Sequence, residues 1–222
     1  MTQHEYNKIE SHMKIHMTDS AHDINHIYRV LYAALDIARS ETGVDLDILT
    51  AACLLHDIAR GRQFANPSIC HAQEGGVMAN DFLLSIGWDE TRAQLVCDCI
   101  SSHRFRGDNP PQSIEAKILF DADKIDVCGA LGIARTLIYE GHTKEPLYVL
   151  DDDGNITTTE CDKDISSFFQ EWEYKLKKVY DGMYTQRAKD IAAKRKKTAQ
   201  GFRDALYEEI CELHASIPSS RP

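Results

Sequence analysis

The apolar residues of this chain recur at intervals of three and four, and this spacing restricts its fold more than any other feature. In the stretch 18–41 they fall at Ile27, Val30, Leu31, Ala34 and Ala38. Residues spaced in this way share one face of an α-helix. Ser20 and Asp23 form a capping-box pattern, which indicates where this helix begins.

Later segments have the same periodicity. We predict helices over 45–60, 71–85, 90–102 and 114–139, with Asp45 as a cap, Gly61 as a stop and a break near Gly129 and Gly132. Helical patterns return over 164–184 and 186–214. The exception is the stretch 147–159, where two short β-prone runs flank Asp-Gly-Asn and predict a small β-hairpin. Because no linker or repeat divides the chain, we predict one all-α domain over residues 1–222.

Composition narrows the class of protein. A chain of 222 residues that is 43% hydrophobic and 27% charged can bury a full core. A formal net charge of -10 argues against nucleic acid as the main partner, because that affinity depends on basic residues. We find no signal-peptide core and no membrane span, so we expect a cytoplasmic protein without a membrane partner. The cysteines form no CxxC pair, which favours reduced thiols.

A histidine and an aspartate lie side by side in "AACLLHDIARG", at the end of an apolar run. The run from Ile48 to Leu55 has no polar face, and a helix that is apolar all round is surrounded by protein. We therefore expect His56 and Asp57 near the interior, where an ionised carboxylate is costly unless it is paired or binds a metal. The alternative is that Asp57 pairs with Arg60 or Arg62 and that His56 is an ordinary core histidine.

Further metal-ligand types accompany this pair. His26 falls at the edge of the apolar stripe of its helix, and His22 and Arg29 lie on the same side. Much later, "ILFDADKIDVCGALGIAR" carries Asp121, Asp123 and Asp126 within another apolar helix. Histidine nitrogens together with carboxylates suit divalent ions such as Mn, Fe, Co, Ni or Zn. Water on such an ion can become a nucleophile.

The order His26, then His56 and Asp57, then a late aspartate resembles the HD superfamily of metal-dependent phosphohydrolases. "HDINHIYRVLYAALDIA" is similar to the first ligand helix of that family, and "AACLLHDIA" to its signature. "SSHRF", "IEAKILFDADKIDVCGALGIAR" and the terminal "YKLKKVYDGMYTQRAKDIAAKRKKTAQGF" look like a subgroup of small bacterial HD hydrolases. The resemblance therefore covers most of the chain.

The resemblance implies an HD-type helical bundle whose ligand-bearing core spans about 20–140, followed by the hairpin and C-terminal helices over about 145–215. It implies one divalent ion (Mn, Fe, Co, Ni, Zn or Mg), with a second ion also possible. The implied ligands are His26, His56, Asp57 and Asp123. Asp123 is chosen because the family ligand usually follows an alanine and precedes a basic residue, as in "ADK", and Asp121 stays an alternative.

The implied function is hydrolysis of a small phosphorylated metabolite, with a nucleotide favoured: either a triphosphate cleaved to monophosphate and pyrophosphate, or a monophosphate dephosphorylated. Val127 disfavours alarmone hydrolysis, because that branch usually has an asparagine at this position, and the Gly-Tyr-Pro signature of the cyclic dinucleotide branch is absent. The alternatives are a non-catalytic nucleotide- or metal-binding module and a di-iron HD oxygenase. A scaffold protein is a third class, and a homodimer is one open partner state.

Several side chains are expected on the substrate side of the metal. Arg29 lies one turn from His26 and Lys124 lies next to Asp123, so both can contact phosphate. The resemblance implies phosphate contacts for His71 and His103 as well, or a role as ligands of a second ion. Arg29 and Lys124 can instead make structural salt bridges, and Glu74 can simply complement a helix dipole. Arg104 and Arg106 lie on a loop that can reach phosphate or only solvent. Glu115 and Asp126 are expected to support the ligating histidines.

Overall fold

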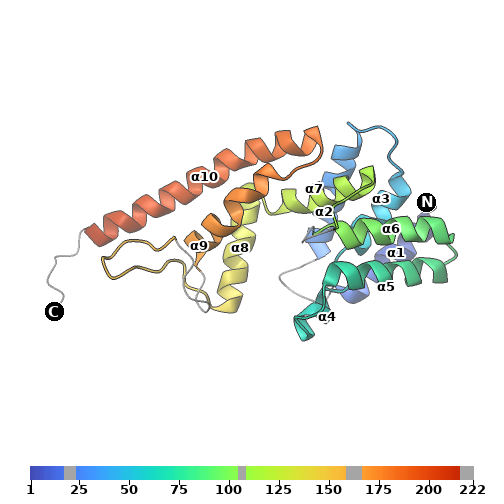
Figure 1. Ribbon diagram of the computed structural model, residues 1–222, viewed down its shortest axis with the longest axis horizontal. Helices are drawn as coiled ribbons and strands as arrows, with labels where there is room; N and C mark the ends of the chain where they lie inside the picture. The colour runs from blue at the N-terminus through green and yellow to red at the C-terminus, as the bar shows by residue number, and fades with distance from the viewer. Residues whose placement is uncertain (18–23, 105–108, 159–166, 216–222) are drawn as a thin grey trace. The chain divides into compact units, whose positions relative to one another are not determined.

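The computed structural model describes residues 1–17, 24–104, 109–158 and 167–215. These residues form helices and no β-strand, which confirms the all-α prediction (Figure 1). In chain order the elements are α1 Gln3–His16, α2 Ile24–Ala38, α3 Leu46–Leu55, α4 Arg60–Ala65, α5 His71–Ser85, α6 Glu90–Ser102, α7 Ile114–Asp126, α8 Gly129–Thr143, α9 Phe168–Tyr174, the 3₁₀ helix η1 Leu176–Asp181 and α10 Gln186–Ala215. Among the described helices, none is both long and apolar enough to cross a membrane.

The chain packs as two compact units. Unit 1 contains Met1–Asp126 and Met183–Ala188, and unit 2 contains Val127–Gly182 and Lys189–Pro222. The prediction of a single HD domain over 1–222, with the ligand-bearing part near 20–140 and the remainder near 145–215, stays a prediction.

Helix α3 is the central element of unit 1. It packs against α1, α2, α6 and α7, and all of its residues from Ala51 to Leu55 are fully buried. The Asp45 carboxylate accepts hydrogen bonds from the backbone N–H groups of Asp47 and Ile48, which confirms the predicted cap. A helix without a polar face is thus enclosed by protein on every side, as its sequence requires.

The predicted end of this helix is wrong. Helix α3 stops at Leu55, residues 56–59 form a turn, and Gly61 lies inside α4 rather than at a stop. At this helix end the Nδ1–H of His56 donates to the carbonyl of Cys53 at 2.7 Å. That carbonyl is one of the last acceptors of the helix, and the backbone continues with tighter bonds such as Arg60 N to Asp57 O. His56 and Asp57 therefore project from a turn.

Helix α1 was not assigned from the sequence. The side chains of Thr2 and Glu5 form a capping box at its start, and Ile9 and Met13 are fully buried on one face. The expected capping box at Ser20 and Asp23 lies outside the described residues, but α2 itself is formed and buries its predicted apolar stripe.

Helices α5 and α6 have the predicted bounds and pack against each other as an antiparallel pair. Gly76 permits their close approach, because a Cβ there would lie 2.4 Å from Ser101 Oγ and 2.9 Å from the Cys97 carbonyl. The antiparallel arrangement brings the start of α5, at His71, beside the end of α6, at His103. Their ring centroids are 5.3 Å apart.

The break predicted near Gly129 and Gly132 is confirmed, since α7 ends at Asp126 and α8 begins at Gly129, with Gly132 inside α8. Gly129 has a φ of +74°, and a Cβ on Gly132 would lie 2.1 Å from the Val127 carbonyl oxygen. A positive φ at Gly129 and the close backbone approach at Gly132 each favour glycine. Within unit 2, the backbone N–H of Gly129 also donates to the Tyr180 hydroxyl at 3.1 Å.

The β-hairpin predicted over 147–159 is not supported. The described part of this segment contains one isolated antiparallel bridge, between Leu150 and Ile156, and no strand on either side of it. The Asp151 carboxylate accepts from the backbone N–H groups of Asp153 and Asn155, so the turn itself forms. Two short strands without further partners are marginal, and here the pairing ends after a single bridge.

Candidate metal centre

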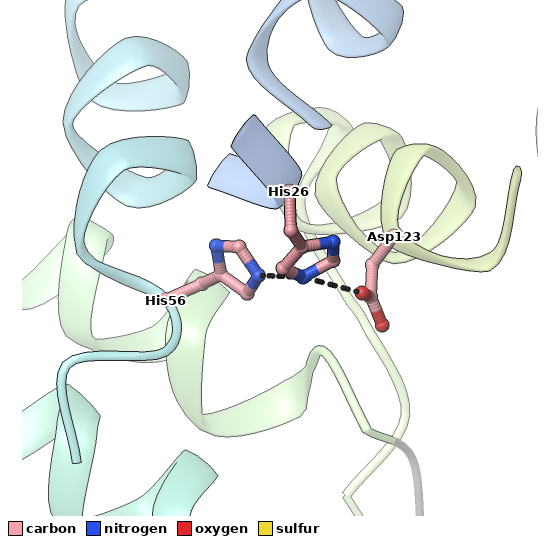
Figure 2. A group of neighbouring side chains, drawn as sticks. All are labelled: His26, His56 and Asp123. Carbon is pink, nitrogen blue, oxygen red and sulfur yellow. Dashed lines mark hydrogen bonds and ion pairs between the residues drawn. The ribbon is translucent and has the colours of Figure 1, made fainter. Parts of the chain in front are cut away.

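Three side chains from distant parts of unit 1 meet at the end of α3. His26 comes from α2, His56 from the turn after α3 and Asp123 from α7, and we call these three residues the His26 group (Figure 2). The Nε2 atoms of His26 and His56 are 3.3 Å apart, and His26 Nε2 lies 3.6 Å from Asp123 Oδ1. Both histidines are buried, whereas Asp123 is partly open.

A second set of ligand types adjoins the first. Asp57, His71 and His103 are all buried and form what we call the His71 group. Asp57 Oδ1 lies 3.3 Å from His71 Nε2 and 3.8 Å from His103 Nε2. The other carboxylate oxygen, Oδ2, lies 3.5 Å from His26 Nε2 and 3.7 Å from His56 Nε2. Asp57 therefore connects the two groups, with one oxygen toward each.

Hydrogen bonds on the outer ring nitrogens orient the histidines. His56 Nδ1–H donates to the Cys53 carbonyl at 2.7 Å, and His103 Nδ1–H donates to the Ile100 carbonyl at 2.6 Å. His26 Nδ1 lies 2.7 Å from Asp126 Oδ2. A carbonyl can only accept, so in the neutral rings of His56 and His103 the inner Nε2 carries a lone pair. Metal-binding histidines are commonly oriented in this way.

The charges of the two groups differ from residue to residue. Burial by itself would raise the pKa of Asp57, but Arg60 and His56 hold it well below its usual range. Burial lowers the pKa of His56 and that of His71, and it lowers the pKa of His103 to about 3. Burial would also lower the pKa of His26, yet its hydrogen bond to Asp126 and the nearby Asp57 carboxylate raise it to about 9. The centre thus contains an ionised carboxylate surrounded by mostly neutral imidazoles.

The residues present fit a divalent ion. Asp57 Oδ2, His71 Nε2 and His103 Nε2 are buried and make no hydrogen bond within the described parts of the chain. Buried polar atoms of this kind are costly unless a further partner satisfies them. Imidazole nitrogens and carboxylate oxygens are the donor atoms that Mn, Fe, Co, Ni and Zn accept.

Asp121 and Asp123 occupy different surroundings. The Asp121 carboxylate is fully buried and accepts from the backbone N–H groups of Tyr184 and Thr185 at 2.8 and 2.7 Å, and from the Thr185 hydroxyl at 2.7 Å. Asp123 points to His26, and Lys124 Nζ lies 3.4 Å from its Oδ2. The structure therefore brings Asp123, and not Asp121, to the histidines.

Of the other predicted site residues, Asp126 contacts the His26 group and Arg29 contacts Asp126, whereas Glu115 bonds elsewhere. Arg29 makes a bidentate ion pair with Asp126, with Nε at 2.7 Å and Nη2 at 3.1 Å. Asp126 thus supports His26 as expected. Glu115 instead accepts from the backbone N–H of Asp45 at 2.8 Å and so anchors the start of α3.

Glu74 and Arg104 are also candidate site residues from the sequence. Glu74 pairs with Arg62, and Arg104 Nη1 lies 3.2 Å from His71 Nδ1. His22 and Arg106 lie outside the described residues. The salt bridge from Arg60 Nε to Asp57 Oδ1, which the sequence offered as an alternative to metal binding, is present at 3.0 Å together with the histidines.

Sequence reasoning missed Gln63. Its side-chain oxygen lies 2.6 Å from His71 Nδ1, so it contacts a residue of the His71 group from helix α4. Gln63 is eight positions before His71 and belongs to no motif. Nothing in the sequence pattern distinguishes it from a surface glutamine.

Comparison with known proteins identifies the family. Residues 23–128 match the HD domain family, and this stretch contains every residue of the His26 and His71 groups. The crystal structure of an HD-superfamily hydrolase from Bacillus thuringiensis is 30% identical, covers 93% of this chain and 97% of its own, and superposes with a TM-score of 0.70. The chain belongs to the HD superfamily. HD domains bind divalent metal ions, and the donor atoms described above are suited to one.

Two further comparisons extend this HD protein's likeness over nearly its whole length. YpgQ of Bacillus subtilis (strain 168), described as uncharacterized, is 29% identical over 200 residues, which is 88% of each chain. The crystal structure of YpgQ in complex with ADP is 25% identical, covers 97% of this chain and 96% of its own, and has a TM-score of 0.72. The similarity thus includes the helices that follow the HD domain.

Proposed function

We propose that this HD protein is a metal-dependent phosphohydrolase that acts on a small phosphorylated metabolite, with a nucleotide as the substrate class. The proposed ligands of the first ion are His26, His56, Asp57 and Asp123. The observation that carries the proposal is Asp57 itself, a buried ionised carboxylate between four histidines, with one oxygen that makes no hydrogen bond within the described residues. A divalent ion would satisfy that oxygen together with the inward-facing nitrogens.

A nucleotide is favoured for two reasons. The relative YpgQ was crystallised with ADP, and its likeness to this chain covers the proposed site. In addition, Lys124 carries positive charge at the margin of the His26 group and is 26% exposed. Local charge of this kind attracts phosphate even in a protein of net charge -10, because binding depends on the local field. A cytoplasmic location and a homodimer stay predictions.

The chemistry divides between the ion and the side chains. A bound divalent ion supplies activation of water and stabilisation of charge on the phosphoryl oxygens. Asp126 holds the His26 ring in place through Nδ1 and is itself held by Arg29. Lys124, beside Asp123, is positioned to neutralise a phosphoryl oxygen that approaches the open edge of the His26 group.

His71 and His103 have two candidate roles, contact with phosphate or ligation of a second ion. In its neutral form His103 donates through Nδ1 to the Ile100 carbonyl, so its Nε2 can accept but not donate. A phosphate oxygen needs a donor, whereas a metal ion needs a lone pair. This hydrogen bond favours a second ion held by Asp57, His71 and His103.

The same observation supports a second candidate function. A di-iron HD oxygenase requires two adjacent ions. A second ion in the His71 group would be compatible with that function, which is therefore the alternative. A non-catalytic nucleotide- or metal-binding module is the remaining alternative. The three candidates differ in what they consume: a phosphate bond, dioxygen, or nothing.

The test is a screen of the purified protein against nucleoside mono-, di- and triphosphates with Mn, Co, Ni and Mg in turn. We expect release of phosphate or pyrophosphate, lost on chelation and restored by the ion. His26→Ala is the matched inactive control, since it removes a ligand without touching Lys124. Dioxygen uptake without phosphate release would favour the oxygenase. A metal-loaded protein that turns over no nucleotide and takes up no dioxygen would refute both enzymes and leave the binding module.

A further inference from the structure

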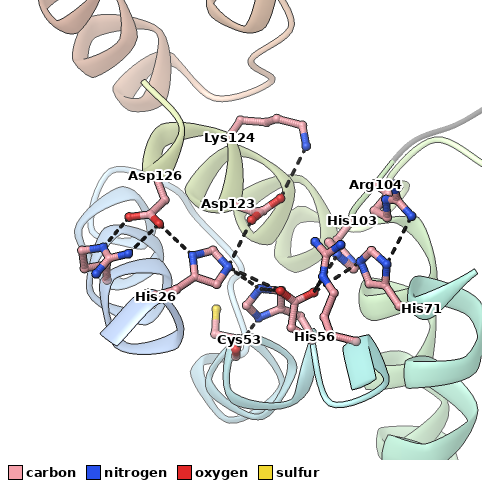
Figure 3. Close-up of polar contacts among 12 residues, drawn as sticks. His26, Cys53, His56, His71, His103, Arg104, Asp123, Lys124 and Asp126 are labelled. Atoms are coloured by element: carbon pink, nitrogen blue, oxygen red, sulfur yellow. Dashed lines mark hydrogen bonds and ion pairs between the residues drawn. The ribbon is translucent and has the colours of Figure 1, made fainter. Parts of the chain in front are cut away.

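The Nδ1 atom of His71 lies next to one hydrogen-bond acceptor and one hydrogen-bond donor. His71 is fully buried, and its Nδ1 lies 2.6 Å from Gln63 Oε1 and 3.2 Å from Arg104 Nη1. Figure 3 shows Arg104 reaching the outer edge of the His71 ring, on the side away from His103. An amide oxygen only accepts a hydrogen bond, whereas a guanidinium only donates.

A neutral imidazole cannot serve both partners at once. If Nδ1 carries the proton, it donates to Gln63 and Nε2 has a lone pair. If Arg104 donates to Nδ1, the proton lies on Nε2, which is 3.3 Å from Asp57 Oδ1 and can donate to it. Only the first tautomer can bind a metal through Nε2. The histidines His56 and His103 differ, because a backbone carbonyl accepts from the Nδ1 of each.

We propose that Gln63 is a positioning residue that sets the tautomer of His71 and thereby decides whether the His71 group accepts a second divalent ion. With Gln63 as the acceptor, Asp57, His71 and His103 present three donor atoms. With Arg104 as the donor, His71 bonds Asp57 instead and the set is incomplete. The tautomer is a property of the metal-free chain, and only its consequence for the second ion rests on the proposed function.

The direct test reads the tautomer of His71 by ¹⁵N NMR of its ring in the metal-free protein. Gln63→Glu can only accept, whereas Gln63→Leu has a similar size and cannot accept. We expect protonated Nδ1 in wild type and in Gln63→Glu, and protonated Nε2 in Gln63→Leu. The control is Gln94→Leu, which alters an exposed glutamine of α6 that bonds Asp98. The same tautomer in wild type and Gln63→Leu, or protonated Nε2 in wild type, would overturn the proposal.

The second readout is the binding of Mn²⁺, titrated into each variant. Loss of a partner on a ligating histidine costs about 10-fold to 100-fold in metal affinity. We expect Gln63→Leu to weaken the second ion by this factor and to leave the first unchanged, while Gln63→Glu binds both. A wild type that binds a single ion, or a second ion that is unaffected in Gln63→Leu, would overturn the link to the metal. Nucleotide hydrolysis is measured separately, so an inactive wild type with the expected tautomers would refute only the proposed function.

Discussion

Two buried carboxylates, one in each unit, have pKa values that are shifted in opposite directions. Asp57 in unit 1 is fully buried and lies among four histidine nitrogens and Arg60. Glu140 in unit 2 is 4% exposed, and neither of its carboxylate oxygens has a hydrogen-bond partner among the residues that the structure describes. Burial, with Glu145 and Glu171 nearby, raises the pKa of Glu140 to about 7, against the weaker effect of Lys175.

The comparison shows why Asp57 is suited to bind a metal ion and Glu140 is not. Both side chains are removed from water, which alone favours the protonated form. Only Asp57 is surrounded by groups that stabilise its negative charge and offer donor atoms of their own. The nitrogens that face Asp57 favour an ionised carboxylate and a bound cation, whereas the acids near Glu140 raise its pKa.

The largest expected effect distinguishes these two acids. Asp57→Ala should remove metal from both groups, and with it phosphate release, because Asp57 contributes an oxygen to each. The loss should exceed the roughly 10-fold to 100-fold reduction that follows loss of an outer partner. Glu140→Gln is the matched control and should keep the full metal content. Metal analysis beside circular dichroism tests this, and full metal occupancy in a helical Asp57→Ala protein would contradict it.

A comparable pair lies within one helix, α7. Asp123→Ala should abolish binding of the first ion, whereas Asp121→Ala should leave the metal content per folded chain unchanged and lower stability. Asp121 accepts from three donors at Tyr184 and Thr185, and each buried donor left without a partner costs roughly 1–3 kcal/mol. Metal content and urea unfolding of both variants separate the two effects. A reversed pattern would mean that Asp121 is the ligand.

The sequence predicts the elements that depend on local pattern. The bounds of α5 and α6 follow from periodicity and caps, and the break after α7 follows from Gly129. Burial of His56 and Asp57 follows from an apolar helix with no polar face. In each case the deciding interactions lie within a few residues of one another, so the pattern contains the information.

Features that depend on a distant partner were not predictable. The contact of Gln63 with His71 depends on how α4 folds back over the start of α5. Glu140 reads as an ordinary polar residue near the end of a helix, yet it is buried. The hairpin predicted over 147–159 was wrong because local strand propensity alone does not form strands without further pairing partners.

The charge state of Glu140 predicts a pH dependence. Its pKa is about 7 in the folded protein against 4.5 for an unperturbed group, so the folded state retains a proton that the unfolded state releases. The stability from this proton is complete below pH 4.5 and is lost as the pH rises through 7. One pKa unit corresponds to about 1.4 kcal/mol, which limits the loss to roughly 3 kcal/mol.

Glu140→Gln keeps a neutral group of the same shape and should lack this dependence. Its free energy of unfolding should exceed that of wild type at pH 8 and approach it near pH 5, in urea titrations of metal-free protein. The difference between the two proteins isolates Glu140 from other groups that titrate in this range. If the free energies of unfolding of the two proteins run parallel from pH 5 to pH 8, the pKa of Glu140 is not raised by folding.

The smallest expected effect concerns the His71 group. In His103→Ala we expect the metal content to fall from near two ions per chain to one, because the lone pair on His103 Nε2 is lost while the His26 group is unchanged. The accompanying fall in kcat/KM should be smaller than in Asp57→Ala, because the His26 group keeps its ion. A lost phosphate contact of about 1.5 to 3 kcal/mol would instead lower kcat/KM by about 10-fold to 100-fold at unchanged metal content. His71→Ala should behave in the same way as His103→Ala.

If the metal content is one before and after, while kcat/KM still falls, these histidines contact phosphate and the inner nitrogen of His103 must be protonated in the complex. Unchanged metal content and unchanged kinetics in both variants would restrict these buried rings to packing, and Asp57 would then serve the His26 group alone.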